Sequence, residues 1–441
     1  MSSYRIAVVG SGISGLSAAW LLSQRHEVTL FEAEDRLGGH SHTINVPSGG
    51  SLLAVDTGFM VYNEAAYPNL AALFDYLDVE TKPTEMSLSI SCGGSTYGAA
   101  GLSSFFDGGR LAFRPRQWRL LADIVRFFRN GGRRANGLPP WLTLGEFLDR
   151  EGYSRDFAER HLLPMAGAIW SSRSSDLRDY PARALLNFFA NHGLLQMFNR
   201  PTWRTVAGGS WSYVEKLIED GKFRHFTGHP VKSVRRFADR VTVETATATA
   251  GTFDHVVLAA QARQNLSMLS DADEIETGLL SSFHMSENPT IVHRDPSFMP
   301  ERRSLWSSWN CCEADGVSSV TYWMNRLQSL AGEDNIFVTL NPRKAAAPGT
   351  LIRSMMYRHP LFSPGSLAAQ EKLWNLQGRR RTWFCGAWFG SGFHEDGLQA
   401  GLAVAEQLGS LQRPWNVTKP SGRIHVGPAP QLLPDLAEAA E

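Results

Sequence analysis

The sequence predicts an α/β protein with a Rossmann-type nucleotide-binding domain and a discontinuous substrate domain of mixed sheet and helices. Three observations predict it. A chain of 441 residues is too long for one compact core. The chain opens on an apolar run, a glycine-rich turn and a second apolar run. Period-two strand patterns then recur in the middle and near the C-terminal end.

The opening is a strand–helix–strand unit. Residues 6–9 are apolar, as in a buried parallel strand, and residues 10–15 form a turn. We expect a helix over 16–23 and a second strand over 28–31. This order is that of a βαβ unit.

The remaining elements follow from periodicity. We expect helices at 68–77, 117–129, 211–218 and 398–408, further helical pieces between 140 and 200, and strands at 231–234, 241–245, 253–258, 318–324, 336–340 and 382–386. The predicted nucleotide-binding domain combines 1–85, 205–270 and 375–415, and the predicted substrate domain combines 86–204 and 271–374. Residues 416–441 are expected to form a disordered tail.

Composition narrows the function classes. Lys plus Arg and Asp plus Glu both number 43, so no overall charge favours nucleic acid. Four cysteines without a CxxC pair indicate reduced thiols, typical of a cytoplasmic protein. The uncharged stretch 6–24 is too rich in Gly and Ser for a signal peptide.

A dinucleotide fingerprint occupies the first turn. Its glycines permit a tight turn, close approach of backbone to a pyrophosphate, and close packing of helix on sheet. The helix N-terminus offers free N–H groups to phosphates. Glu32, 20 residues after Gly12, is placed to bind a ribose hydroxyl and disfavours NADP. The predicted contacts here are Gly10, Gly12, Ile13, Ser14, Gly15 and Glu32.

The following residues read E-x-x-x-R-x-G-G from Glu32 to Gly39. Arg36 can add charge toward a diphosphate, and paired glycines let backbone lie against a flat cofactor. This stretch resembles the flavin-containing amine oxidase superfamily, which includes protoporphyrinogen oxidases and phytoene-type desaturases. The resemblance implies non-covalent FAD, with Ala33, Arg36, Gly38 and Gly39 among its contacts.

Three further stretches resemble the same superfamily. Asp56-Thr57-Gly58 resembles a motif near the cofactor, and the backbone of Val231 would meet the adenine. The C-terminal match places Gly386, Gly397 and Leu398 at the flavin, with a helix N-terminus aimed at the isoalloxazine. Small residues at 397, 400 and 401 would permit close approach.

Two departures separate the chain from amine oxidases. Ala387 stands where these families often have an acid, and no convincing equivalent exists for the lysine beside flavin N5, Lys344 being the nearest candidate. A narrower resemblance is to predicted NAD/FAD-binding proteins and the N-terminal flavoprotein part of plant cyclopropane fatty-acid synthases. It implies fatty-acyl chains by analogy.

The tripeptide His394-Glu395-Asp396 precedes the expected C-terminal helix. We predict His394 and Glu395 as catalytic residues, one accepting a proton while a flavin takes the hydride. Asp396 suits a helix N-cap better. His40, His42 and His359 are either near the flavin or satisfied by backbone. No cluster completes a metal site, so no metal is expected.

A basic amphipathic helix is expected around 116–133, with arginines on one side and apolar residues on the other. Such a helix either touches a membrane interface peripherally or packs its apolar side on the protein.

Together these features predict an FAD-dependent oxidoreductase that removes a hydride from a substrate C–H bond. We favour a hydrophobic substrate, fatty-acyl or another lipid, with desaturation. The alternatives are a flavin amine oxidase, an NAD-linked dehydrogenase, and a non-enzymatic lipid-binding protein of the same fold, such as a Rab GDP-dissociation inhibitor.

Overall fold

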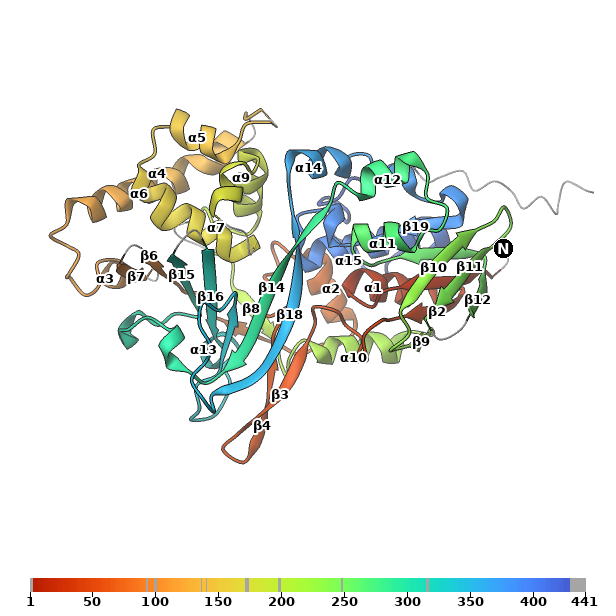
Figure 1. Ribbon diagram of the computed structural model, residues 1–441, viewed down its shortest axis with the longest axis horizontal. Helices are drawn as coiled ribbons and strands as arrows, with labels where there is room; N and C mark the ends of the chain where they lie inside the picture. The colour runs from red at the N-terminus through yellow and green to blue at the C-terminus, as the bar shows by residue number, and fades with distance from the viewer. Residues whose placement is uncertain are drawn as a thin grey trace, which may run out of the picture.

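A computed structural model describes residues 3–92, 94–98, 101–135, 137–139, 141–170, 174–196, 200–246, 249–314 and 317–428. Figure 1 shows a five-stranded sheet with its helices at one end, a second sheet in the middle and a group of helices beside that second sheet. Within the described residues no helix is both long and apolar enough to cross a membrane.

The first sheet is parallel and has five strands in the order β19-β13-β1-β2-β9. Its central strands are buried because their side chains are apolar on both faces, as in sheets covered by helices. The strands are β1 (Arg5–Val9), β2 (Glu27–Phe31), β9 (Arg224–Phe226), β13 (His255–Leu258) and β19 (Thr382–Phe384). Three distant chain segments therefore build one sheet, which confirms the predicted fold class.

Two helices pack closely beside this sheet: α1 (Ile13–Leu22) and α15 (His394–Gly409). A Cβ on Gly401 would lie 2.2 Å from the Ser14 carbonyl oxygen, and one on Gly397 would lie 2.8 Å from Ser14 Oγ. The small residues of α15 thus allow it to approach α1 closely. Three further elements complete this region: α2 (Pro68–Tyr76), α10 (Trp211–Asp220), and the sheet β10 (Val231–Arg236), β11 (Val241–Thr245) and β12 (Thr249–Phe253).

The predicted strand 253–258 is two strands. Asp254 separates β12 from β13, and its carboxylate accepts a hydrogen bond of 2.6 Å from the Arg5 backbone N–H. The bend redirects the chain from the three-stranded sheet into the parallel sheet.

The middle of the molecule is a mixed sheet with strand order β18-β14-β17-β16-β15-β6-β7. Long strands β14 and β18 run antiparallel beside the nucleotide-binding region (Figure 1). The strands are β6 (Leu88–Cys92), β7 (Ser95–Gly98), β14 (His284–His293), β15 (Trp309–Ala314), β16 (Val317–Trp323), β17 (Phe337–Leu340) and β18 (Leu351–Leu361). Two hairpin-like pairs accompany it: β3 (Thr43–Ser48) with β4 (Ser51–Asp56), and β5 (Thr81–Thr84) with β8 (Trp203–Val206).

Helices cover one end of this sheet: α3 (Leu102–Phe105), α4 (Pro115–Ala135), α5 (Leu144–Arg150), α6 (Arg155–Phe157), α7 (Leu163–Trp170), α8 (Ser174–Arg178) and α9 (Ala182–Asn191). Four shorter helices lie elsewhere: α11 (Ala262–Met268), α12 (Glu274–Leu280), α13 (Met324–Leu327) and α14 (Pro364–Gln370).

The basic helix α4 packs its apolar side on the protein. Leu120, Ile124 and Phe127 are buried in the core of the substrate region. These residues are therefore not available to a membrane, as expected for an ordinary surface helix. Peripheral membrane contact through the exposed side of the helix stays a prediction.

The predicted tail begins too early. Arg423 donates a 2.7 Å hydrogen bond to Asp396, and the Gly427 carbonyl accepts one of 3.1 Å from Gln407. Residues 416–428 are therefore held against α15, and disorder was the wrong expectation for them. Residues 429–441 lie outside the described part of the chain.

Candidate functional site

The turn between β1 and α1 is built around glycine. Gly10 has φ +101°, and its N–H donates to the Phe31 carbonyl at 2.8 Å. A Cβ on Gly15 would lie 1.9 Å from the Gly10 carbonyl oxygen, so only glycine lets the helix start so close to the turn. This geometry agrees with the roles predicted for both residues.

Gly12 leaves open space at the N-terminus of α1. No described atom lies within 4 Å of a Cβ built there, and no described side chain caps the helix. The first turn of a helix, here including Ile13 and Ser14, has N–H groups without intrahelical partners. Open space beside free N–H groups is what a phosphate group requires.

Glu32 ends β2 beside this turn. Its carboxylate accepts hydrogen bonds from the Ser11 N–H at 2.8 Å and from the Glu34 N–H at 2.9 Å. The backbone of Glu32 also pairs with His229 at 2.8 Å, which brings the segment leading to Val231 to the same edge. Ala33 is exposed at this edge. The structure thus gathers the residues predicted for the ribose and adenine.

The paired glycines pass against the fingerprint. A Cβ on Gly39 would lie 3.0 Å from Gly12 Cα, and both Gly38 and Gly39 have positive φ. Arg36 does not extend freely: its guanidinium donates to the Gly39 carbonyl at 2.8 Å and pairs with Glu34 at 2.8 Å. It therefore braces this loop.

His40 follows the paired glycines and has an unsatisfied atom. Its Nε2 is buried and has no hydrogen-bond partner in the described part of the chain. Burial lowers the pKa of His40 to about 4. An orphaned ring nitrogen beside an open glycine cradle fits a polar, flat cofactor such as FAD, because buried polar atoms are normally paired.

The first turn of α15 meets this region through His394. Its Nε2 lies 2.9 Å from Ser41 Oγ and 3.0 Å from the Tyr213 hydroxyl, and these two hydroxyls are bonded to each other. The ring stacks on Phe59 with centroids 3.9 Å apart. Burial lowers the pKa of His394 to about 3, so the imidazole is neutral at physiological pH.

Glu395 has a structural role that argues against the predicted catalytic one. It is fully buried, and its oxygens accept from the backbone N–H groups of Asn69 at 3.1 Å and Leu70 at 3.0 Å. Asn69 Nδ2 and Gln399 Nε2 each donate at 2.8 Å. The carboxylate therefore caps the N-terminus of α2 from another helix.

Asp396 stabilises the start of α15, but from its third residue rather than as the N-cap. It accepts a 2.8 Å hydrogen bond from the Phe393 N–H and pairs with Arg423. Helix α15 accordingly begins at His394, four residues before the predicted start.

The C-terminal contacts predicted for the flavin are packing residues in this structure. Leu398 is fully buried in the core, and a Cβ on Gly386 would collide with the Trp388 indole, 2.2 Å from Nε1. Gly397 faces α1. Their predicted contact with FAD stays a prediction.

A second group of polar side chains is joined by Tyr357, which the sequence analysis did not single out. The Tyr357 hydroxyl lies 2.9 Å from His42 Nδ1 and 2.6 Å from Thr57 Oγ1. The rings of His40 and His359 are 5.5 Å apart. Tyr357 and His359 come from β18, whose alternation marks a strand but cannot reveal which side chains meet residues 40–42.

Aromatic rings surround Phe393, the residue that precedes His394. Phe393 stacks on Phe188 with centroids 4.6 Å apart, and Phe188 lies 4.6 Å from Trp170. These rings come from α7 and α9, so the helical region reaches the start of α15. In the part of the chain that the structure describes, no group of His, Cys, Asp and Glu could hold a metal ion.

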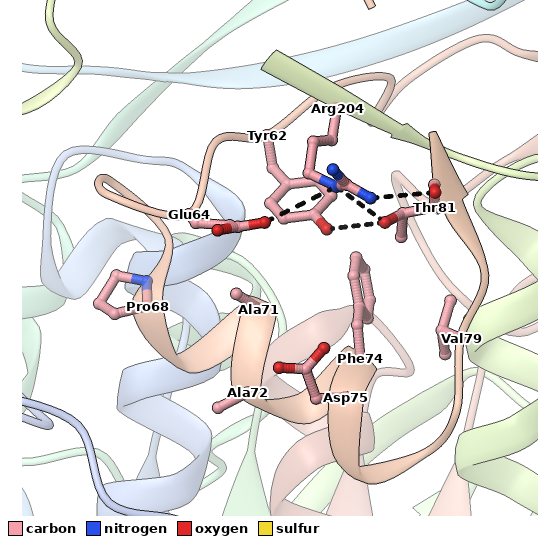
Figure 2. A pocket seen from close by; sticks show the side chains of 10 residues that line it. All are labelled: Tyr62, Glu64, Pro68, Ala71, Ala72, Phe74, Asp75, Val79, Thr81 and Arg204. Atoms are coloured by element: carbon pink, nitrogen blue, oxygen red, sulfur yellow. Dashed lines mark hydrogen bonds and ion pairs between the residues drawn. The ribbon is translucent and has the colours of Figure 1, made fainter. Parts of the chain in front are cut away.

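Figure 2 shows a separate hollow of about 340 Å³ between α2, β5 and β8. Arg204 donates to Thr81 Oγ1 at 2.9 Å, and the Tyr62 hydroxyl donates to the same atom at 3.3 Å. Because these polar groups satisfy one another, we assign the hollow no role in the chemistry.

Comparison with known proteins identifies the class. The family model described as flavin containing amine oxidoreductase matches residues 13–286, more than half of the chain. The protein belongs to this family and is an FAD-dependent oxidoreductase.

Individual relatives agree with that class. The chain is 24% identical over 369 residues to AofH of Mycobacterium tuberculosis, which is named as a flavin-containing monoamine oxidase. The matched residues make up 79% of this chain and 73% of AofH. A 57-residue stretch, 13% of this chain and 12% of the relative, is 46% identical to the flavin-dependent L-tryptophan oxidase RebO of Lentzea aerocolonigenes.

Among solved structures, the CLA-producing fatty acid isomerase from P. acnes has a TM-score of 0.67 at 16% identity and covers 92% of this chain and 99% of its own. Cyclohexylamine oxidase from Brevibacterium oxydans has a TM-score of 0.66 at 18% identity, and the match covers 92% of this chain and 100% of that one. At these identities the likeness shows a shared fold.

Proposed function

We propose that the protein binds FAD non-covalently and acts on a hydrophobic substrate, a fatty-acyl chain or another lipid. One carbon would give up a hydride to the flavin and the adjacent carbon would release a proton to solvent, and the electron pair left by that proton would form the double bond. The observation that carries this proposal is the surroundings of His394. Its ring nitrogen contacts two hydroxyls and its ring stacks on Phe59, so these contacts form an uncharged surface. The preceding residue, Phe393, stacks on Phe188, which in turn lies against Trp170. Such a surface favours an uncharged hydrocarbon over a cation.

The nucleotide would lie along residues 10–15, 32–39 and 231, where open space and free N–H groups meet Glu32. When bound, FAD supplies the hydride acceptor. Glu32 would turn from Ser11 toward ribose hydroxyls, and the N-terminus of α1 would stabilise the diphosphate.

His394 acts in this proposal as a neutral hydrogen-bonding group. A hydroxyl hydrogen of Ser41 or Tyr213 pointing at Nε2 leaves the ring proton on Nδ1, which is then free to donate. A pKa of about 3 makes the imidazole a weak proton acceptor at neutral pH. In this proposal His394 binds and orients the substrate or cofactor, and its predicted role as proton acceptor stays a prediction.

Lys344 does not take the place of the lysine that amine oxidases have beside flavin N5. Its ammonium donates to Ser297 Oγ at 2.7 Å and lies over the Phe298 ring. This supports a substrate other than an amine.

A flavin amine oxidase is the second candidate, favoured by the named activities of AofH and cyclohexylamine oxidase. Membership of an enzyme family argues against a non-enzymatic lipid-binding protein and an NAD-linked dehydrogenase. A hydrocarbon substrate would be drawn from a bilayer, and we expect no nucleic-acid partner and a cytoplasmic location.

The test mixes the oxidised, purified protein anaerobically with linoleic acid or with cyclohexylamine, and follows the flavin absorbance. We expect bleaching by the fatty acid with a product two mass units lighter, and none with the amine. Bleaching by the amine alone would instead support amine oxidation. A fatty-acid product of unchanged mass, with the flavin oxidised at the end, would contradict net desaturation.

A further inference from the structure

Helix α3 lies at the end of the molecule farthest from the five-stranded parallel sheet (Figure 1), and large apolar side chains are exposed in α3 and the residues that follow it. Phe113 is 94% exposed, Leu102 66% and Trp118 53%. They lie in α3, in the turn before α4 and in the first turn of α4. Single exposed apolar residues are ordinary, but several in one short stretch of surface indicate an interaction site.

This apolar surface is fixed on a folded base. The Trp118 indole N–H donates to the Ala112 carbonyl at 2.8 Å, and its ring lies 4.5 Å from that of Phe106. Phe106 is buried and packs on Phe105, with ring centroids 5.3 Å apart. The exposed rings are therefore presented by the protein and not carried on a loose end.

The charges beside these rings are positive. Arg110, Arg114 and Arg119 are exposed, and none of them forms an ion pair within 4 Å in the described part of the chain. The charge of Arg119 acts at longer range on Asp156, whose pKa is lowered mainly by Arg116. The only acid between 102 and 122 is Asp107, which is paired with Arg302.

Three other arginines of α4 are paired with acids. Arg116 makes two hydrogen bonds to Asp156, at 2.8 and 2.6 Å, and Arg126 pairs with Asp123 at 3.1 Å. Arg134 pairs with Glu151. Arg129 and Arg133, near the other end of α4, are exposed like the three arginines beside the rings. Of these five described arginines, only the three near residue 113 lie next to exposed apolar side chains.

We propose that residues 102–119 form a docking surface for an anionic lipid bilayer. Phe113, Trp118 and Leu102 enter the boundary between headgroups and acyl chains, and the three free arginines bind lipid phosphates. Aromatic rings with adjacent cations suit this boundary better than a neutral protein surface. The docking surface does not depend on the proposed substrate.

The experiment is cosedimentation of the FAD-loaded full-length protein with vesicles of phosphatidylcholine alone or with 30% phosphatidylserine. We expect at least about tenfold stronger binding to the anionic vesicles, weakened by 0.5 M salt because exposed charges are screened. Phe113→Ser/Trp118→Ser and Arg114→Glu/Arg119→Glu should each lower that binding about tenfold or more.

Matched controls separate the site from general surface properties. Leu52 and Met356 are also exposed, 66% and 52%, so Leu52→Ser/Met356→Ser should leave vesicle binding unchanged. Lys372→Glu controls for charge. An unchanged flavin spectrum and melting temperature show that each variant is folded.

Equal or absent binding to both vesicles would overturn the proposal, as would variants that bind like the wild type. A concentration-dependent dimer abolished by Phe113→Ser/Trp118→Ser would also overturn it, because a second copy of the chain would then cover this surface. Activity toward the soluble test substrates should remain in all variants, so failure here is distinguishable from failure of the proposed function.

Discussion

The N-termini of α1 and α15 lie in the same region of the molecule but are built differently. At α1, Gly12 leaves open space, and no described side chain caps the helix. At α15, Asp396 binds the Phe393 N–H, Arg423 binds Asp396, and Glu395 caps α2. The first terminus is left for a ligand, whereas the second is satisfied by the chain itself. A glycine motif at the start of a helix therefore occurs both where the N-terminus is open and where it is occupied by side chains of the protein, and only the neighbouring atoms distinguish the two cases.

Substitutions at the contact between α1 and α15 should lower the free energy of unfolding more than the other substitutions considered below. Gly401→Ala places a Cβ 2.2 Å from the Ser14 carbonyl oxygen and 2.3 Å from Ser17 Oγ, so the helices must separate. We expect a loss of roughly 3 kcal/mol or more in the free energy of unfolding, measured by urea denaturation.

Gly278→Ala is the matched control, because an added Cβ meets no described atom in that exposed helix. It should be neutral or stabilise the protein by about 0.5–1 kcal/mol. Equal effects of the two substitutions would contradict the close packing of α1 and α15.

Removing the capping carboxylate should have the next largest effect. Glu395→Ala leaves two backbone N–H groups of α2 and two side-chain amides without their acceptor, so we expect a loss of about 2–3 kcal/mol. The measurement is again denaturant unfolding.

The same residue tests the revised assignment of roles. Glu395→Gln keeps one acceptor oxygen and the side-chain volume, and kcat of the folded variant should stay within about threefold of wild type. A drop of about 100-fold or more in kcat with stability retained would restore Glu395 as a catalytic group.

Replacing His394 should have a smaller effect, and the pH profile of flavin reduction should show little dependence on this residue. Its pKa of about 3 lies below the ordinary value, so the ring stays neutral between pH 5.5 and 9. We expect the pH profile of flavin reduction in this range to show no inflection due to His394, so the profile of His394→Gln should have the same shape as that of the wild type. Its contribution to stability is complete above the unfolded pKa near 6.5 and is lost as pH falls toward 3. An inflection near pH 6.5 that disappears in the variant would show that His394 titrates during turnover.

Local signals predicted much of the fold. The strand, turn and helix over 5–22 were predictable because the glycines of the turn follow in a fixed spacing that steric contacts require. The position of Glu32 beside this turn was predictable from its distance along the chain. The helix at 211–220 and the strand at 382–384 were predictable from periodicity.

Contacts between distant residues were not predictable. Glu395 meets Asn69 across 326 positions, and His42 meets Tyr357 across 315. A titratable tripeptide in a glycine-rich turn looks the same in sequence whether it caps another helix or faces a substrate. The basic helix was ambiguous for a similar reason, since periodicity shows an apolar side but not what covers it.

The affinity of the apoprotein for FAD in Gly12→Ala tests the central claim most directly. Alanine tolerates the backbone angles of this residue, φ −63° and ψ 174°, and its Cβ would meet no described atom. The apoprotein should therefore keep its melting temperature. Its FAD dissociation constant should rise about 10–100-fold, which corresponds to losing one or two hydrogen bonds to a charged group. An unchanged dissociation constant would contradict the placement of the cofactor diphosphate at the N-terminus of α1.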